Sequence, residues 1–145
     1  MLSRASTGVL AVLGDDDYPY AVPLNFVYDE GKIFIHCARS GHKLDSMRRH
    51  AKVSFCIVDK EQVVPELFAT DYRSVIAFGK ANEVVDDKEK LHAMRLFTGK
   101  YSPELHEEGE KEIRKDWNIL CVMRIDVEHM TGKEAMDSVR NHANS

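Results

Sequence analysis

The chain has 145 residues, of which 43% are hydrophobic and 30% are charged, a composition typical of a globular protein with one core and not of a disordered or fibrous chain. We therefore expect one domain over residues 1–145. A formal net charge of −4 and a pI near 6.0 argue against a broad electrostatic interaction with nucleic acid or an anionic membrane. The first apolar run, residues 7–13, is far shorter than the ~20 residues of a spanning helix, so we expect a cytoplasmic protein.

The first third of the chain predicts three strands. Residues 7–13 form a short apolar run bounded by glycines, which favours a buried strand over a helix. Residues 20–28 and residues 32–37 are rich in β-forming side chains, and the sequence Asp-Glu-Gly at 29–31 separates them. This pattern predicts a hairpin between the two runs.

The middle of the chain predicts a short helix followed by two strands. Leu44 and Met47 are three positions apart and flanked by charged residues, as expected for a surface helix that buries one face. Residues 53–58 predict the next strand, and a polar loop around Pro65 leads to a long strand over residues 72–85.

The last third predicts two helices and a final strand. Residues 86–99 begin with two aspartates that suit an N-cap and first turn, and residues 102–116 form a charged helical stretch with a proline in its first turn. Residues 119–127 predict the last long strand, and residues 131–134 a turn or extended edge. About six strands and three peripheral helices favour a mainly β fold, an antiparallel barrel.

Common catalytic and metal motifs are missing from the sequence. The three cysteines, Cys37, Cys56 and Cys121, lie far apart and form no CxxC pair, so we expect reduced thiols. The glycine-lysine pairs do not complete a P-loop, and no nucleophile elbow occurs. His36, Cys37 and His42 lack a fourth ligand, and we expect no metal site.

The most informative segment is residues 36–43, His-Cys-Ala-Arg-Ser-Gly-His-Lys, where a strand, a glycine turn and a helix follow one another. Free N–H groups of a first helical turn attract anions, and Ser40 and Lys43 add a hydroxyl and a cation. The segment therefore predicts a phosphate site. The alternative is a plain turn in which Ser40 caps the helix.

Several segments together resemble one known family. These are residues 20–28 (YAVPLNFVY), 33–38 (IFIHCA), 41–43 (GHK), 53–56 (VSFC), 72–81 (YRSVIAFGKA) and 131–134 (TGKE). In this order they resemble the pyridoxamine 5′-phosphate oxidase-related family, within it the Nim-type nitroimidazole-resistance proteins. The resemblance covers nearly the whole chain.

The resemblance implies a split β-barrel that binds flavin mononucleotide (FMN) in each of two clefts of a homodimer. It places residues of one strand along the flavin ring, residues of the next strand beside the ring and ribityl chain, residues of the turn at the phosphate, and residues of a later strand at the border of the cofactor. In that order these are Val22, Pro23, Leu24, Asn25 and Phe26; His36, Cys37 and Ala38; Ser40, His42 and Lys43; and Arg73, Ser74 and Val75.

The resemblance also implies a flavin-dependent reductase that takes electrons from a donor such as NAD(P)H and passes them to a nitroaromatic or related small acceptor. His36 is the candidate catalytic residue, since its ordinary pKa suits hydrogen bonding or proton donation; the alternative is a strand-end histidine satisfied by backbone. A second functional alternative is a non-catalytic flavin or haem carrier of the same fold. Gly41-His42-Lys43 stands where the true oxidases carry Ser-Arg-Lys, which argues against pyridoxamine phosphate oxidation.

Overall fold

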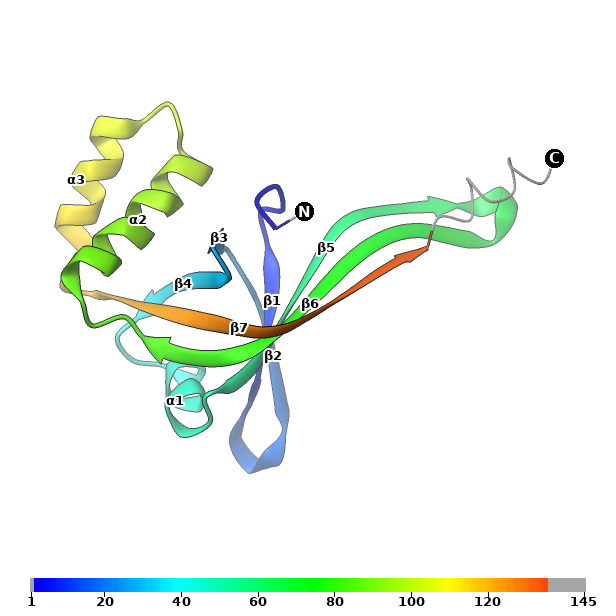
Figure 1. Cartoon of the computed structure of the whole chain (residues 1–145), viewed down its shortest axis with the longest axis horizontal. Helices are drawn as coiled ribbons and strands as arrows, with labels where there is room; N and C mark the ends of the chain where they lie inside the picture. Colours follow the sequence, from blue (N-terminus) through cyan, green and yellow to red (C-terminus); the bar gives the residue numbers. More distant parts are fainter. Residues whose placement is uncertain (1, 136–145) are drawn as a thin grey trace.

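The computed structural model describes residues 2–135, and within them seven strands form one antiparallel sheet in the order β2-β1-β5-β6-β7-β4-β3. The sheet curls on itself, and its two outer strands, β2 and β3, follow each other in sequence (Figure 1). The result is a barrel open along one side, which confirms the predicted mainly β, antiparallel split barrel. The strands are β1 (Gly8–Leu13), β2 (Pro19–Leu24), β3 (Val27–Asp29), β4 (Lys32–Ala38), β5 (Lys52–Val64), β6 (Ala69–Glu83) and β7 (Leu120–Ala135).

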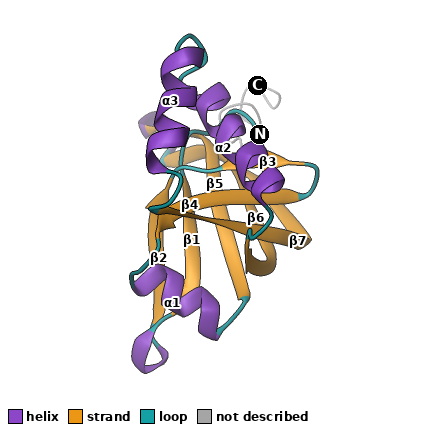
Figure 2. Ribbon diagram, turned by 90° about the vertical axis from the view of Figure 1, so that its left-hand side faces the viewer, coloured by secondary structure: helices purple, strands orange, loops and turns teal. Residues whose placement is uncertain are grey.

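Three α-helices in the described part lie at the two ends of the barrel: α1 (His42–Arg49) at one end, and the pair α2 (Asp87–Tyr101) and α3 (His106–Asp116) at the other (Figure 2). The Asp86 side chain accepts a hydrogen bond from the Glu89 N–H, so it caps α2 as expected. The third helix begins later than predicted, because residues 102–105 form a hydrogen-bonded turn between the helices. No helix within residues 2–135 is long and apolar enough to span a membrane.

The predicted hairpin is present, but its first strand is divided. Glu30 and Gly31 both have positive φ angles, 46° and 81°, as a two-residue hairpin turn requires. Only β3 pairs with β4, whereas β2 pairs with β1 on the other side of the barrel. The prediction of a single strand over residues 20–28 is therefore wrong. The strand is interrupted at Asn25-Phe26, where the chain crosses from one edge of the sheet to the other.

Alternation along β4 divides the core into two clusters. Ile33, Ile35 and Cys37 point into the barrel, where they pack with Leu10, Phe55 and other buried side chains. Phe34 points the other way, into a smaller cluster that α2 and α3 cover. The helix pair is thus held by a second hydrophobic layer outside the barrel.

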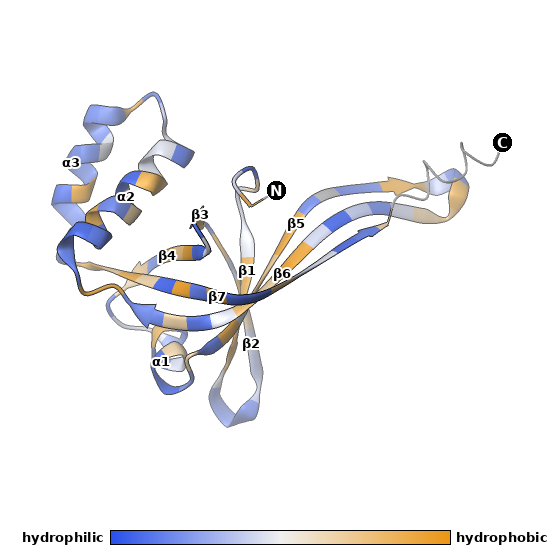
Figure 3. Cartoon of the chain, in the orientation of Figure 1, coloured by the Kyte–Doolittle hydropathy of each residue, from blue (hydrophilic) through white to orange (hydrophobic). Residues whose placement is uncertain are grey.

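The far halves of β5, β6 and β7 project from the barrel as an arm (Figure 1). The strands predicted at 53–58 and 119–127 are too short, because β5 goes on pairing with β6 out to Val64 at the tip, and β7 pairs with β6 as far as Ala135 opposite Tyr72. The tip carries a 3-10 turn, Pro65–Leu67, followed by Phe68, whose φ is 50°. The Phe68 side chain is 98% exposed, and Figure 3 shows apolar residues at the tip of the arm.

Candidate functional site

The open side of the barrel contains a cavity of about 240 Å³ next to the predicted phosphate turn. Its walls come from Tyr20 on β2, from Cys37 and Ala38 on β4, and from residues 40–44. In the described part, β4 pairs with β3 only over Lys32–Phe34, so its second half and the edge strand β2 keep unpaired backbone groups at the opening. Such edges offer hydrogen bonds to a ligand.

The first turn of α1 keeps its N–H groups available. The N-cap is Gly41, with φ 141°, and no side chain among the described residues caps it. The alternative reading, in which Ser40 caps the helix, is therefore wrong. Lys43 lies in this first turn on the cavity wall. Unpaired N–H groups, the positive end of the helix dipole and an ammonium group together suit an anion.

The side chain of His42 is held by contacts outside the turn. Its Nδ1 lies 3.4 Å from an Asp15 carboxylate oxygen, and the same carboxylate accepts a 2.8 Å hydrogen bond from Arg49. The imidazole packs edge-on against the Tyr20 ring, with centroids 4.5 Å apart. These contacts tie the predicted phosphate turn to the β1–β2 loop and to β2. Any contact of His42 with an anion in the turn cavity would therefore be made through its backbone N–H.

His36 faces a different cavity, of about 230 Å³, between β4 and the helix pair. Its ring packs edge-on against Phe97 of α2, with centroids 4.6 Å apart, and Asn25 and Tyr101 line the same cavity. Burial, and to a smaller extent the charge of Lys43, lowers the pKa of His36. At neutral pH the imidazole is therefore uncharged and can donate or accept a hydrogen bond.

The predicted ring segment on β2 and its crossover is only partly accessible. Val22 and Leu24 are half-buried against the barrel core, and Pro23 points outward. Phe26 has no exposed surface and packs edge-on against Phe55, with centroids 5.0 Å apart. Its side chain therefore cannot touch a cofactor in this conformation.

Two residues at the end of α2 hold this crossover, and the sequence carried no signal for them. Lys100 Nζ donates a 2.9 Å hydrogen bond to the Phe26 carbonyl, and the Phe26 N–H donates to the Tyr101 hydroxyl at 3.0 Å. The Tyr101 hydroxyl in turn lies 2.7 Å from the Ser6 carbonyl, to which it donates. These contacts join residues far apart in the chain, which is why no local pattern reveals them.

The residues predicted to border the cofactor from a later strand lie on the arm. Arg73 pairs with Glu134 on β7 at 3.3 Å, and Ser74 and Val75 are opposite Lys133 and Gly132 in register. At ~3.3 Å per residue, Arg73 is about 20 Å further along β6 than Gly79 at the barrel. Within one chain the predicted residues therefore occupy three places: the turn cavity, the α2 cavity with the crossover, and the arm.

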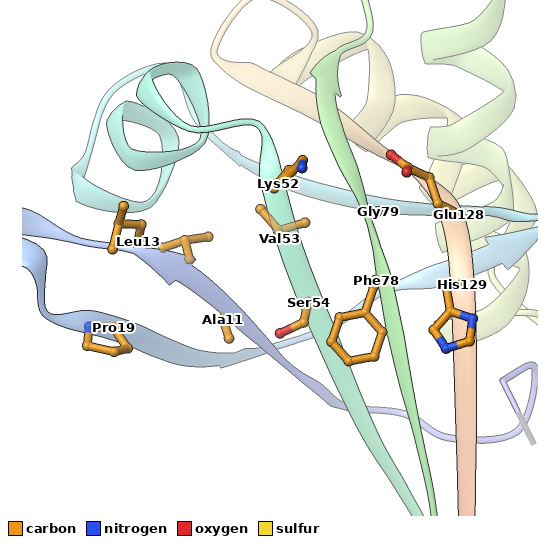
Figure 4. Close-up of a pocket in the computed structure, with 11 residues that line it drawn as sticks. Ala11, Leu13, Pro19, Lys52, Val53, Ser54, Phe78, Gly79, Glu128 and His129 are labelled. Atoms are coloured by element: carbon orange, nitrogen blue, oxygen red, sulfur yellow. The ribbon is translucent and has the colours of Figure 1, made fainter.

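A broader groove of about 520 Å³ lies on the outer face of the sheet. Ala11, Ser54, Phe78 and His129 stand in register across β1, β5, β6 and β7, and Figure 4 shows their side chains in one row. We call this surface the open face; it consists of Val9, Ala11, Leu13, Ser54, Cys56, Ile76, Phe78 and His129. Phe78 is 42% exposed and Val9 36%, so the open face is an uncovered apolar surface.

Comparison with known proteins places the chain in a family. Among solved structures, a candidate 5-nitroimidazole antibiotic resistance protein from Bacteroides thetaiotaomicron is 23% identical, with a TM-score of 0.73 over 90% of this chain and 77% of its own. An FAD-binding protein from Mesorhizobium loti is 23% identical, with a TM-score of 0.66 over 93% of this chain and 90% of its own. An FAD and heme binding protein from Mycobacterium smegmatis is 18% identical, with a TM-score of 0.78 over 99% and 74%.

At these identities the structural neighbours establish the fold. No curated protein sequence matches the chain. The family model described as pyridoxamine 5′-phosphate oxidase, however, matches residues 1–134. Because that match spans nearly the whole chain, the protein belongs to the pyridoxamine 5′-phosphate oxidase family.

Proposed function

We propose that this protein binds FMN at the open side of the barrel and acts as a flavin-dependent reductase of nitroaromatic or related small acceptors. The observation that carries the proposal is the cavity at the start of α1, where an uncapped first turn and Lys43 face the unpaired edges of β2 and β4. The flavin-binding neighbours and the family are consistent with it.

The residues of the turn fit a phosphate monoester. The N–H groups of the first turn and the Lys43 ammonium would hold its oxygens, with Ser40 within the same wall. Backbone groups of β2 and of His36–Ala38 would border the ribityl chain and ring. The flavin supplies the electron and hydride chemistry when bound, and the protein positions it and excludes competing reactions.

A complete site requires a second copy of the chain. The turn cavity, about 240 Å³, is smaller than the ~300 to 1,000 Å³ usual for cofactor sites, and Arg73, Ser74 and Val75 lie too far out on the arm to reach it. In a homodimer that buries the open face, the arm of one copy would extend over the cavity of the other. The exposed apolar residues of that face support this assembly.

His36 is the proposed acceptor-side residue. It lies beside the end of β4, separated from the turn by Cys37 and Ala38, and its cavity is open to a small molecule. Because its pKa is lowered, an uncharged imidazole would orient the acceptor by hydrogen bonding at neutral pH. We expect His36→Ala to keep its flavin and to lose about 10²-fold or more in turnover with NAD(P)H and a nitroimidazole, if proton transfer contributes. Wild-type turnover in the flavin-loaded variant would show that His36 takes no part in the reaction and is a structural residue.

The cofactor test combines a visible spectrum with titration. Purified protein should show paired flavin absorption bands, whereas a Soret band alone would favour the haem carrier. FMN titration of Lys43→Ala should give a dissociation constant at least about tenfold higher, because a charge-assisted hydrogen bond contributes on the order of 1.5 to 3 kcal/mol. Lys111→Ala, an exposed change on α3, is the matched control. Equal affinity in the two variants would contradict the phosphate assignment.

Enzyme and carrier differ in turnover. A reductase should consume NAD(P)H continuously in the presence of a nitroimidazole and flavin-loaded protein, with a rate proportional to protein concentration. Flavin that is reduced once, or only over hours, would instead favour the carrier.

A further inference from the structure

Two cysteines that are far apart in sequence meet inside the barrel. Cys37 on β4 and Cys121 on β7 are direct register partners in the antiparallel pair. Both side chains belong to the barrel core, with only 8% and 4% of their surface exposed. Cys37 lines the turn cavity, but the proposed cofactor contacts of residues 36–38 use backbone groups, so the proposed function leaves both thiol groups unused.

The backbone spacing suits a covalent link. Partner residues in antiparallel strands have Cα atoms about 4.5 or 5.5 Å apart, depending on the hydrogen-bonding position. Disulfides have Cα atoms ~4.4 to 6.8 Å apart, so the Cα spacing of either kind of register pair lies within the range of a disulfide. The two groups are also coupled electrostatically: burial raises the pKa of Cys37, and the charge of Lys43 and the neighbouring Cys121 oppose part of that rise.

We propose that Cys37 and Cys121 form an oxidation site, in which a hydroperoxide converts the two thiols to a disulfide that links β4 to β7. Cys37 reacts first, since it lines the open cavity beside Lys43 whereas Cys121 lies deeper. The Cys37 sulfur attacks the peroxide, which becomes water in the case of hydrogen peroxide, and leaves a sulfenic acid on Cys37.

The second step closes the bond. The Cys121 thiol gives up its 3.3 Å hydrogen bond to the Glu83 carboxylate, and its sulfur attacks the Cys37 sulfenic sulfur. The hydroxide that leaves takes the Cys121 proton. In total, two thiols and one hydrogen peroxide give one disulfide and two waters.

The third cysteine provides an internal control. Cys56 lies on β5 opposite Val9 and Ile76, so neither register neighbour carries a thiol. It belongs to the open face and is more accessible than the other two. Its oxidation should therefore give single-residue products or links between chains, not a link within the chain.

The test compares wild type, Cys56→Ser and Cys121→Ser after equilibration of the native full-length protein with hydrogen peroxide. Samples are quenched in acid, alkylated and analysed by intact mass and non-reducing peptide mapping. Wild type and Cys56→Ser should lose two hydrogen atoms in mass and yield a peptide pair joined through Cys37 and Cys121, and dithiothreitol should reverse both changes. Cys121→Ser should instead show a dimedone-trapped sulfenic acid on Cys37.

The contrary results are equally clear. Wild type in which Cys37 gains oxygen atoms and never joins Cys121 would overturn the proposal. So would joined peptides that contain Cys56 in place of either partner. Because the decisive measurement is made on wild type, a folding defect in a variant leaves the outcome readable.

Discussion

The hydroxyl of Tyr101 is a sensitive test of how the helix pair holds the barrel opening. It accepts a 3.0 Å hydrogen bond from the Phe26 N–H and lies 2.7 Å from the Ser6 carbonyl and 2.8 Å from the Phe26 carbonyl. Lys100 already donates to the Phe26 carbonyl, so we assign the single hydroxyl proton of Tyr101 to the hydrogen bond with the Ser6 carbonyl. Burial raises the pKa of Tyr101, which keeps that proton in place.

The change Tyr101→Phe removes the hydroxyl and keeps the ring, which stacks on Phe97 at 6.1 Å. It deletes two hydrogen bonds, each worth about 1 kcal/mol net, and leaves the N–H of a fully buried residue, Phe26, without its partner, at a cost of about 1 to 3 kcal/mol. These effects overlap, and we expect a loss of about 2 to 4 kcal/mol. At about 3 °C per kcal/mol for a chain of this length, Tm should fall by about 6 to 12 °C.

Urea and thermal unfolding followed by circular dichroism would measure this loss. Tyr18→Phe is the matched control, because the Tyr18 side chain is 74% exposed, and its hydroxyl is solvated in the folded chain. A Tyr101→Phe variant as stable as Tyr18→Phe would refute the reasoning. That result would mean that water replaces the hydroxyl at the crossover.

Four further predictions concern other parts of the molecule. Lys90→Met should destabilise by about 2 kcal/mol in urea unfolding, because it removes the ammonium that donates to the Trp117 and Leu120 carbonyls. The lowered pKa of His36 means that the unfolded chain binds this proton first, so stability falls as pH drops from 6.5 through the folded pKa; His36→Gln should reduce the difference in urea midpoint between pH 7 and pH 5. Burial raises the pKa of Cys121 to about 12, so mass-spectrometric alkylation kinetics at pH 8 should show it reacting at least about tenfold more slowly than a free thiol. Phe78→Asp should yield monomers in sedimentation, because it charges the open face; an unchanged dimer would exclude that face as the interface.

Local patterns were sufficient for most individual elements. Apolar runs and segments rich in β-forming side chains identified the strands, and one face of most of these strands packs on the barrel core. The positive φ at Gly31 and the capping role of Asp86 follow from the chemistry of single residues, whereas Glu30 has a positive φ because the two-residue turn between paired strands requires it. The predicted phosphate turn also has the strand, glycine and helix order that the structure shows.

The lengths of the strands and the positions of their breaks depended instead on contacts with other segments of the chain. Nothing in the residues of the arm distinguishes a polar loop from a strand, yet pairing with β6 extends β5 to the tip and β7 as far as Ala135 opposite Tyr72. The break at Asn25-Phe26 occurs where the chain leaves its pairing with β1 and begins to pair with β4, and Lys100 and Tyr101 bind this crossover from a distant helix. Hydrogen bonds of this kind join segments whose separation hides them from any local pattern.

The sequence by itself determined the class of fold, the strand, glycine turn and helix order at residues 36–43, and the family, since each depends on short segments whose residue types restrict the backbone directly. Only the tertiary structure decided how those segments meet. In the folded chain His36 and Lys43 line different cavities, and Arg73 lies on the arm. The tertiary structure also brought together Cys37 and Cys121, which the sequence presented as unrelated thiols. The physical reason is register: the pairing of β4 with β7 is set by the burial of a whole strand face, and a shift of one residue would turn every side chain to the opposite side.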